Sequence, residues 1–199
     1  DGDAAFFEAR SRNYRNLFDP STGFFRGKDS KGNWREPFEP VRCTHAGKKG
    51  GDYTEGSAWH YLWHILQDSE DLIALLGGPE KFVQKLDTLF EVTPPAALTG
   101  YTQDVTGLIG QYSHGNEPCH HVIYLYTLAG RQEKAAEKIR QVFRQFYKCE
   151  PGGLCGNDDC GQMSAWYIFS ALGSYPVNPV GGQFVAGEAQ VRPLRKLPW

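Results

Sequence analysis

Apolar side chains recur along this chain with the spacing of helices, and no stretch keeps the strict alternation of a strand. Two segments, residues 79–90 and 132–147, carry one apolar stripe opposite a charged face, which is typical of outer helices that cover a core. Three further segments are apolar or aromatic on most faces, and this predicts buried inner helices. These segments are residues 57–66, 118–129 and 162–172.

The order of these segments predicts the architecture. Residues 4–17 are expected to form a first helix, and inner and outer helices then alternate, giving about seven helices in all. Such alternation is typical of helical hairpins wound into a toroid. We therefore expect an all-α fold of the toroid type with one core.

Three loops are expected to meet at one end of this fold, because helices separated by one antiparallel neighbour begin at the same end. They precede the three inner helices and span residues 52–56, 111–117 and 156–161. Each contains a carboxylate and lies next to glycine. Capping explains a single acidic residue before a helix, but carboxylates in three converging loops are typical of a site for acid–base chemistry.

These carboxylates suit the cleavage of a glycosidic bond. One carboxylic acid protonates the leaving oxygen, and in the inverting geometry a second carboxylate, roughly 6.5–9.5 Å away, activates water. Glu55, Asp158 and Asp159 are the candidate catalytic residues, and they come from two separate loops. Adjacent aspartates cannot both face one pocket from a regular element, so we expect Asp159 to be the base and Asp158 to cap or support.

Oxygen-bearing side chains in the middle loop suit a hard cation. Gln111, Asn116 and Glu117 are candidate metal ligands, because Ca²⁺ prefers neutral and charged oxygens, although their spacing is not that of a helix–loop–helix calcium site. Flat rings beside polar groups suit a sugar. The candidate substrate-binding residues are Trp34, Trp59, His114 and Glu117.

Two rival kinds of site are open at this point. His60 and His64 stand four residues apart on a predicted helix, and further histidines cluster near Glu117, so a transition-metal site is an alternative. Cys119 lies at a predicted helix start, which would lower its pKa and suit a nucleophile. Neither alternative carries the flanking residues of a zinc-protease helix or a nucleophile turn.

Composition excludes several classes of partner. The 199 residues carry a formal net charge of −2, which gives no electrostatic case for nucleic acid or an anionic membrane. No apolar run reaches the roughly 18–20 residues of a membrane span, and the first residues lack the pattern of a signal peptide. The chain thus reads as an internal piece of something longer. Five cysteines leave the compartment undecided.

Three strings resemble the C-terminal catalytic motifs of glycoside hydrolase family 92 α-mannosidases. They are GDYTEGSAWHYLW, HGNEPCHHVIYLY and GNDDCGQMSAWYIFSALGSYPV. RSRNYRNLFDPSTGFFRGKD is similar to the family segment that precedes the first of them. The resemblance covers roughly residues 5–182.

The resemblance implies an (α/α)6 barrel, a Ca²⁺ ion that engages mannose hydroxyls, and exo-hydrolysis of α-mannosides with inversion, with α-1,2-linked mannose as the expected substrate. Glu55 matches the family's general acid, and the pair Asp158 and Asp159 matches the motif that holds the base. The stretch with Gln111, Asn116 and Glu117 matches the region associated with calcium. The family is usually secreted or periplasmic, and this chain is expected to be so too.

Two departures limit what the resemblance implies. The family barrel has twelve helices and follows a β-sandwich domain, whereas this chain has about seven predicted helices and no sandwich. Residues 1–182 are therefore expected to form part of the catalytic barrel, and residues 183–199 a divergent tail. Part of a barrel exposes apolar surface, which predicts another chain or domain that completes it. Without that completion, the alternatives are a fragment that binds carbohydrate without cleaving it and a helical scaffold with ordinary caps.

Overall fold

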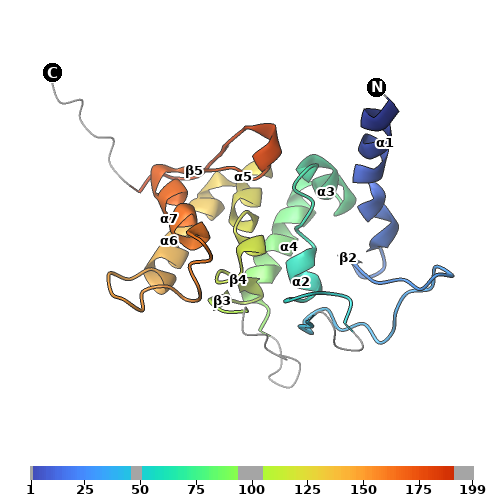
Figure 1. Cartoon of the computed structure of the whole chain (residues 1–199), viewed down its shortest axis with the longest axis horizontal. Helices are drawn as coiled ribbons and strands as arrows, with labels where there is room; N and C mark the ends of the chain where they lie inside the picture. The colour runs from blue at the N-terminus through green and yellow to red at the C-terminus, as the bar shows by residue number, and fades with distance from the viewer. Residues whose placement is uncertain (1, 46–50, 94–104, 191–199) are drawn as a thin grey trace.

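The computed structural model describes residues 2–45, 51–93 and 105–190. Within them, seven α-helices are accompanied by three antiparallel hairpins of two-residue strands (Figure 1). The helices are α1 (Gly2–Ser11), α2 (Ala58–Tyr61), α3 (Ser69–Leu75), α4 (Pro79–Glu91), α5 (Leu125–Leu128), α6 (Gln132–Phe146) and α7 (Gln162–Leu172). The prediction of a mainly helical chain is confirmed. The hairpins were missed because two-residue strands are too short to show alternation.

The hairpins lie at the ends of helices. They pair β1 (Phe18–Asp19) with β2 (Phe24–Phe25), β3 (Leu108–Ile109) with β4 (Tyr112–Ser113), and β5 (Ser174–Tyr175) with β6 (Val185–Ala186). Short 3₁₀ turns complete the described elements. They are η1 (Asn13–Leu17), η3 (Glu117–Cys119), η4 (Val122–Tyr124) and η5 (Pro179–Gly181).

The two long amphipathic helices, α4 and α6, form where their apolar stripes predicted them, with ends within one residue. Leu86 of α4 and Ile139 of α6 are both 0% exposed. Burying one such side chain stabilises the fold by about 1.5–3 kcal/mol. Lys134 of α6 bonds Asp87 of α4 at 2.6 Å, and Tyr126 of α5 donates to the same carboxylate. The stripe thus faces the core, and a polar cluster joins the helices beside it.

Two of the predicted inner helices are broken into shorter pieces. In the first, α2 ends at Tyr61, and the Trp63 carbonyl accepts a bond from His121 Nε2 at 2.7 Å instead of continuing a helix. In the second, the His120 carbonyl accepts from Trp166 Nε1 at 3.0 Å, and 3₁₀ turns precede α5. The continuous helices predicted at 57–66 and 118–129 are therefore wrong, because buried side chains capture main-chain carbonyls.

The third predicted inner helix, α7, has the expected length but is buried on one side only. Met163 and Trp166 are 0% exposed, whereas Ile168 and Leu172 are 57% and 61% exposed. No layer formed by the described residues covers the outer side of this helix, so the prediction of burial on most faces is wrong. The exposed side chains form the kind of apolar face that the sequence predicted for part of a barrel.

The hairpin β5–β6 connects α7 to the end of the described chain. Tyr175 pairs with Val185, and the amide of Gln190 bonds the carbonyl of Ala171 at 2.9 Å. The domain boundary predicted after Gly182 falls between the two strands of this hairpin. Residues 183–190 accordingly lie against α7, and residues 191–199 are outside the described residues.

Helix α1 lies at one end of the molecule, and α6 and α7 lie at the other (Figure 1). No residue of α1 is buried, and Phe6 and Phe7 are 55% and 65% exposed. The helix is joined to the rest by contacts near its end, such as the bond from Gln67 Nε2 to the Ser11 carbonyl. None of the helices in the described part of the chain is long and apolar enough to cross a membrane.

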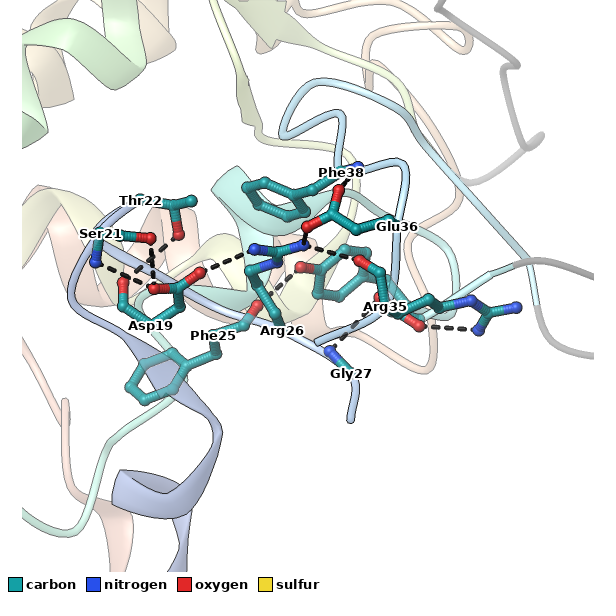
Figure 2. A network of polar contacts seen from close by, with 11 residues as sticks. Asp19, Ser21, Thr22, Phe25, Arg26, Gly27, Arg35, Glu36 and Phe38 are labelled. Atoms are coloured by element: carbon teal, nitrogen blue, oxygen red, sulfur yellow. Dashed lines mark hydrogen bonds and ion pairs between the residues drawn. The ribbon is translucent and has the colours of Figure 1, made fainter. Parts of the chain in front are cut away.

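A buried arginine organises the irregular segment that follows β2. Arg26 is 5% exposed, and its guanidinium donates to Asp19 at 2.7 Å, to Glu36 at 2.6 Å and to the Arg35 carbonyl at 2.6 Å (Figure 2). The Phe38 ring lies 4.2 Å from the guanidinium carbon. A buried charge is stable only with such partners, and removing one of them costs about 3–5 kcal/mol. The loop therefore has a defined path although it contains no helix.

The same loop is tied to the first residues of the first acidic loop, Asp52 and Tyr53. Arg35 donates to Asp52 Oδ1 at 2.7 Å, and the Arg35 amide bonds the Gly27 carbonyl at 3.0 Å. The Tyr53 hydroxyl donates to the Phe25 carbonyl at 2.6 Å. The glycine- and proline-rich segment thus fixes where the chain enters the predicted site.

Asp19→Asn is expected to lower stability at neutral pH and to flatten its pH dependence in acid. The Ser21 hydroxyl bond, assisted by Arg26, lowers the pKa of Asp19 from its ordinary 3.8 to about 2. The stabilisation from this carboxylate is therefore present above about pH 4 and is lost as the pH falls through about 2. Urea unfolding at several pH values between 7 and 2 measures both effects. Glu39→Gln, at an exposed carboxylate, is the control, and parallel curves for Asp19→Asn and the unmodified chain would contradict the prediction.

Candidate functional site

The three acidic loops meet at one small cavity of about 110 Å³. The first loop contributes Glu55, the second Gly115, Asn116 and Glu117, the third Gly156, Asn157 and Asp159, and Thr106 completes the wall. In Figure 1, β3–β4 and the connection between α6 and α7 lie at the same lower edge of the molecule. Each loop thus brings one carboxylate to the cavity: Glu55, Glu117 and Asp159.

Backbone strain is concentrated at this cavity. Among the described residues, the non-glycine residues with positive φ are Glu55 at 53°, Asp159 at 45° and Cys160 at 57°. A side chain in this region of backbone space costs about 1–3 kcal/mol, and such residues persist only where their surroundings hold them. Two of these three residues, Glu55 and Asp159, line the cavity, so backbone strain coincides with the predicted site.

A hydrogen bond joins the first and second loops. Asn116, 8% exposed, donates Nδ2 to the Glu55 carbonyl at 3.0 Å. The bond fixes the Asn116 amide group, so that its nitrogen faces the backbone of Glu55 and its oxygen is left for another partner. The contact therefore couples the position of Glu55 to the loop that carries Glu117.

The adjacent aspartates of the third loop have different surroundings. Asp158 Oδ1 accepts bonds from the amide of Ser164 at 3.0 Å and from its hydroxyl at 2.8 Å, as a capping residue does. Asp159 lines the cavity and is exposed. This is the division of environments that the sequence predicted, and the catalytic roles of the two residues stay predictions.

Thr106 also lines the cavity, although no pattern in the sequence selects it. A Cβ on Gly115 would lie 1.9 Å from Thr106 Oγ1, and a Cβ on Gly156 would lie 2.8 Å from the same atom. Both loops therefore pack their main chains directly against this threonine, which only glycine permits. The glycines stand in the printed motifs, but the side chain they pack against lies outside them, so spacing alone could not reveal it.

Three predicted site residues lie in the core instead of at the cavity. Trp59 is 6% exposed and packs edge-on against Phe24. His114 is 0% exposed, with its ring nitrogens bonded to the hydroxyls of Tyr112 and Tyr147, and burial lowers its pKa to about 2. Gln111 is 2% exposed and bonds the end of α4. None of the three lines the cavity, and their predicted contacts with substrate or metal stay predictions.

Trp34 lies elsewhere on the surface. It pairs with Lys28 across an isolated bridge, and Lys28 Nζ is 3.9 Å from the centre of its ring. It does not line the cavity. The aromatic content of the loop thus stabilises the loop through cation–π contacts.

Neither rival site survives the geometry of the described residues. His60 Nδ1 accepts the Ser57 amide at 2.9 Å, and burial lowers its pKa to about 4. Within residues 2–45, 51–93 and 105–190, no three His, Cys, Asp or Glu side chains are grouped closely enough to hold a metal. Cys119 is 3% exposed, and burial raises its pKa to about 12, opposite to the lowering expected at a helix start. It is therefore no activated nucleophile.

The cavity does fit a hard cation that is only partly held by the protein. Asn116 and Glu117 carry side-chain oxygens and line it, and Glu117 Oε1 is buried. Calcium takes six to eight oxygens and accepts main-chain, water and substrate oxygens as readily as carboxylates. Two of the three predicted ligands thus line the cavity and Gln111 does not, and the ion site stays a prediction.

Comparison with known proteins points to one family. The sequence model described as "Glycosyl hydrolase family 92 catalytic domain" matches residues 1–194. A family GH92 α-mannosidase from Bacteroides thetaiotaomicron, solved with mannoimidazole, is 44% identical, with a TM-score of 0.86, over 94% of this chain and 25% of its own. A family GH92 inverting mannosidase from the same species is 37% identical, with a TM-score of 0.75, over 94% of this chain and 25% of its own.

A curated relative is also similar. It is described as an uncharacterized secreted glycosidase of Arthroderma benhamiae, and it is 29% identical over 85% of this chain and 22% of its own length. The present chain therefore spans about a quarter of the length of these relatives.

Glu55→Gly is expected to be more stable than Glu55→Ala by about 1 kcal/mol, because a Cβ in the left-handed region costs about 1–2 kcal/mol. Elsewhere the order is the reverse, since glycine loses more backbone entropy on folding. Urea unfolding of both variants measures the difference. The pair Glu39→Gly and Glu39→Ala is the control and should show the ordinary order; the ordinary order at position 55 would refute the assignment of strain.

Proposed function

The chain belongs to glycosyl hydrolase family 92, and we propose that it carries the acid and base of an α-mannosidase that releases terminal mannose from glycans with inversion. The observation that supports this most is the single cavity shared by Glu55 and Asp159, both held at positive φ in loops that begin inner helices. The α-1,2 linkage is the expected substrate. Two relatives whose titles name mannosidases support the substrate class.

In the proposed reaction, Glu55 gives its proton to the glycosidic oxygen while the bond from that oxygen to mannose C1 breaks. Water attacks C1 from the opposite face, and its proton passes to Asp159, so the released mannose has the inverted configuration. Exchange with solvent then restores the proton on Glu55 and removes it from Asp159. Asp158 supports this step by holding the start of α7 through Ser164.

Calcium would be held at the same cavity by Asn116 and Glu117, with the remaining oxygens from main chain, water or sugar hydroxyls. Such an ion supplies positive charge that orients a hydroxylated ligand. The bond from Asn116 to Glu55 would then link the loop that binds the ion to the loop that carries the acid.

The described helices are proposed to be part of an (α/α)6 barrel that a further domain or chain completes. Support comes from the coverage of about a quarter of the relatives and from the exposed apolar side chains of α7. A secreted or periplasmic location is proposed because a curated relative is described as secreted.

Glu55→Gln should lower turnover of an α-mannoside roughly 10²- to 10⁴-fold, the usual contribution of a general acid, and leave mannose binding nearly unchanged. Asp159→Asn should have a similar effect, since the amide cannot accept the proton of water. Turnover is followed by proton NMR, which also shows whether β-mannose appears first. Glu70→Gln, an exposed carboxylate on α3, is the control.

The same assay distinguishes an enzyme from a fragment that binds carbohydrate without cleaving it. Binding of mannose without turnover by the unmodified chain would identify a carbohydrate-binding fragment and sink the enzymatic proposal. Release of α-mannose as the first product would refute inversion.

Calcium is expected to raise the melting temperature of the unmodified chain, because a ligand that binds only the folded state stabilises it, by about 2.7 kcal/mol at 100 times its Kd. Glu117→Gln should reduce the shift, since it removes the charged donor, whereas Glu70→Gln should keep it. Differential scanning calorimetry with Ca²⁺ or Mg²⁺ measures the shifts. No calcium shift in the unmodified chain would contradict the proposed ion site.

A further inference from the structure

The strained residue Glu55 lies within a stretch whose carbonyl groups are all hydrogen bonded. The carbonyls of residues 53, 54, 55 and 56 accept bonds from Thr44, Tyr61, Asn116 and again Thr44, in that order. None of these donors belongs to a helix or strand that contains the stretch. The contacts therefore come from three separate parts of the chain and converge on four consecutive residues.

Thr44 contacts the residues on both sides of Glu55. Its hydroxyl donates to the Tyr53 carbonyl at 2.6 Å and accepts from the Tyr53 amide at 3.2 Å. Its own amide and carbonyl bond Gly56 at 2.8 and 3.2 Å, as an isolated antiparallel bridge. One threonine thus fixes the main chain before and after the strained residue.

Tyr61 makes the same double contact one residue along. Its hydroxyl donates to the Thr54 carbonyl at 2.9 Å and accepts from the Thr54 amide at 3.0 Å. Its ring packs on Tyr53 with centroids 5.1 Å apart. Because a hydroxyl is both donor and acceptor, it can satisfy both main-chain groups of one residue in a segment that has no regular partner.

We propose that Thr44 and Tyr61 are positioning residues, whose hydroxyls hold Glu55 in its left-handed conformation so that its carboxyl group meets the glycosidic oxygen. The inference rests on the proposed role of Glu55 as general acid. Without these bonds, a residue at φ 53° relaxes toward ordinary backbone angles, which moves its side chain. A displacement of about 1 Å in such a group costs up to about 100-fold in rate.

The loop with Thr44 is itself anchored. Arg26 and Arg35 tie this loop to Asp19, Glu36 and Asp52 (Figure 2). These ion pairs order the part of the loop that precedes Thr44, and both Arg35 and Thr44 bond the first acidic loop, at Asp52 and Tyr53.

The test compares Thr44→Val and Tyr61→Phe, which remove only the hydroxyls, on two substrates. A mannose disaccharide needs a proton on its leaving oxygen, whereas fluoride leaves from α-mannosyl fluoride without one. Both variants should lose roughly 10- to 100-fold in kcat on the disaccharide, with KM nearly unchanged, and change less than about threefold on the fluoride. Thr44→Ser keeps the hydroxyl and should restore the rate. Thr88→Val, which removes a hydroxyl from the exposed side of α4, is the control.

Each outcome decides between the two proposals. If Glu55→Gln shows the leaving-group dependence and the hydroxyl variants do not, Glu55 is the acid and the positioning proposal fails. If Glu55→Gln loses both substrates equally, the acid assignment fails and the positioning proposal fails with it. A loss shared by both substrates in Thr44→Val would also overturn positioning.

Hydrogen exchange gives a second readout that does not depend on turnover. The amides of residues 53 and 54 donate to the hydroxyls of Thr44 and Tyr61, so a peptide that reports these two amides should exchange faster in Thr44→Val and Tyr61→Phe than in the unmodified chain. Exchange unchanged in both variants would overturn the proposal even for a chain without activity.

Discussion

The backbone conformation of Glu55 is the constraint on which the site depends. A left-handed residue with a long side chain is unfavourable by itself, so its neighbours must hold it there. The charge pairs of Arg26 order an irregular loop, the loop presents Thr44, and Thr44 fixes the main chain on both sides of Glu55. Asn116, from another loop, donates a further hydrogen bond to the Glu55 carbonyl. Interactions that look unrelated along the sequence thus act on one peptide segment.

The core has a second task besides burial. Its histidines and tryptophans bond main-chain carbonyls, as His121 does at Trp63 and Trp166 does at His120. Burial lowers the pKa of His121 to about 4, so the ring stays neutral at physiological pH and donates from the tautomer that carries its proton on Nε2. These bonds end helices early and turn the chain toward the cavity. The rings of His121 and Trp166 thereby give partners to buried main-chain carbonyls that the interrupted helices leave without their usual donors.

The sequence predicts best those features that depend on residues close together along the chain. The stripes of α4 and α6 give their bounds within a residue, because amphipathic burial repeats along each helix. The carbonyl bonds that break residues 57–66 and 118–129 come from side chains some 46 to 58 positions away, and no local pattern signals them. The helix α3 was overlooked although Asp68, followed by two acidic residues, is a recognisable start.

Loop spacing and charge select Glu55, Asn116, Glu117 and Asp159, and the structure brings all four to one cavity. Trp59 and His114, which were selected as rings suited to a sugar, lie in the core instead. An aromatic or imidazole ring serves a core as well as a sugar, and only burial distinguishes the two. No local pattern selects Thr44, because the residues that it bonds, Tyr53 and Gly56, are separated from it by an irregular segment.

The packing of Gly115 and Gly156 on Thr106 makes two loops mechanically dependent on each other. With no side chain between them, one loop cannot shift toward the cavity without displacing the other through the threonine. A ligand that drew Glu117 inward would therefore also shift the loop that carries Asp159. If the proposed ion binds at the second loop, it would then change the rate constant as well as the affinity.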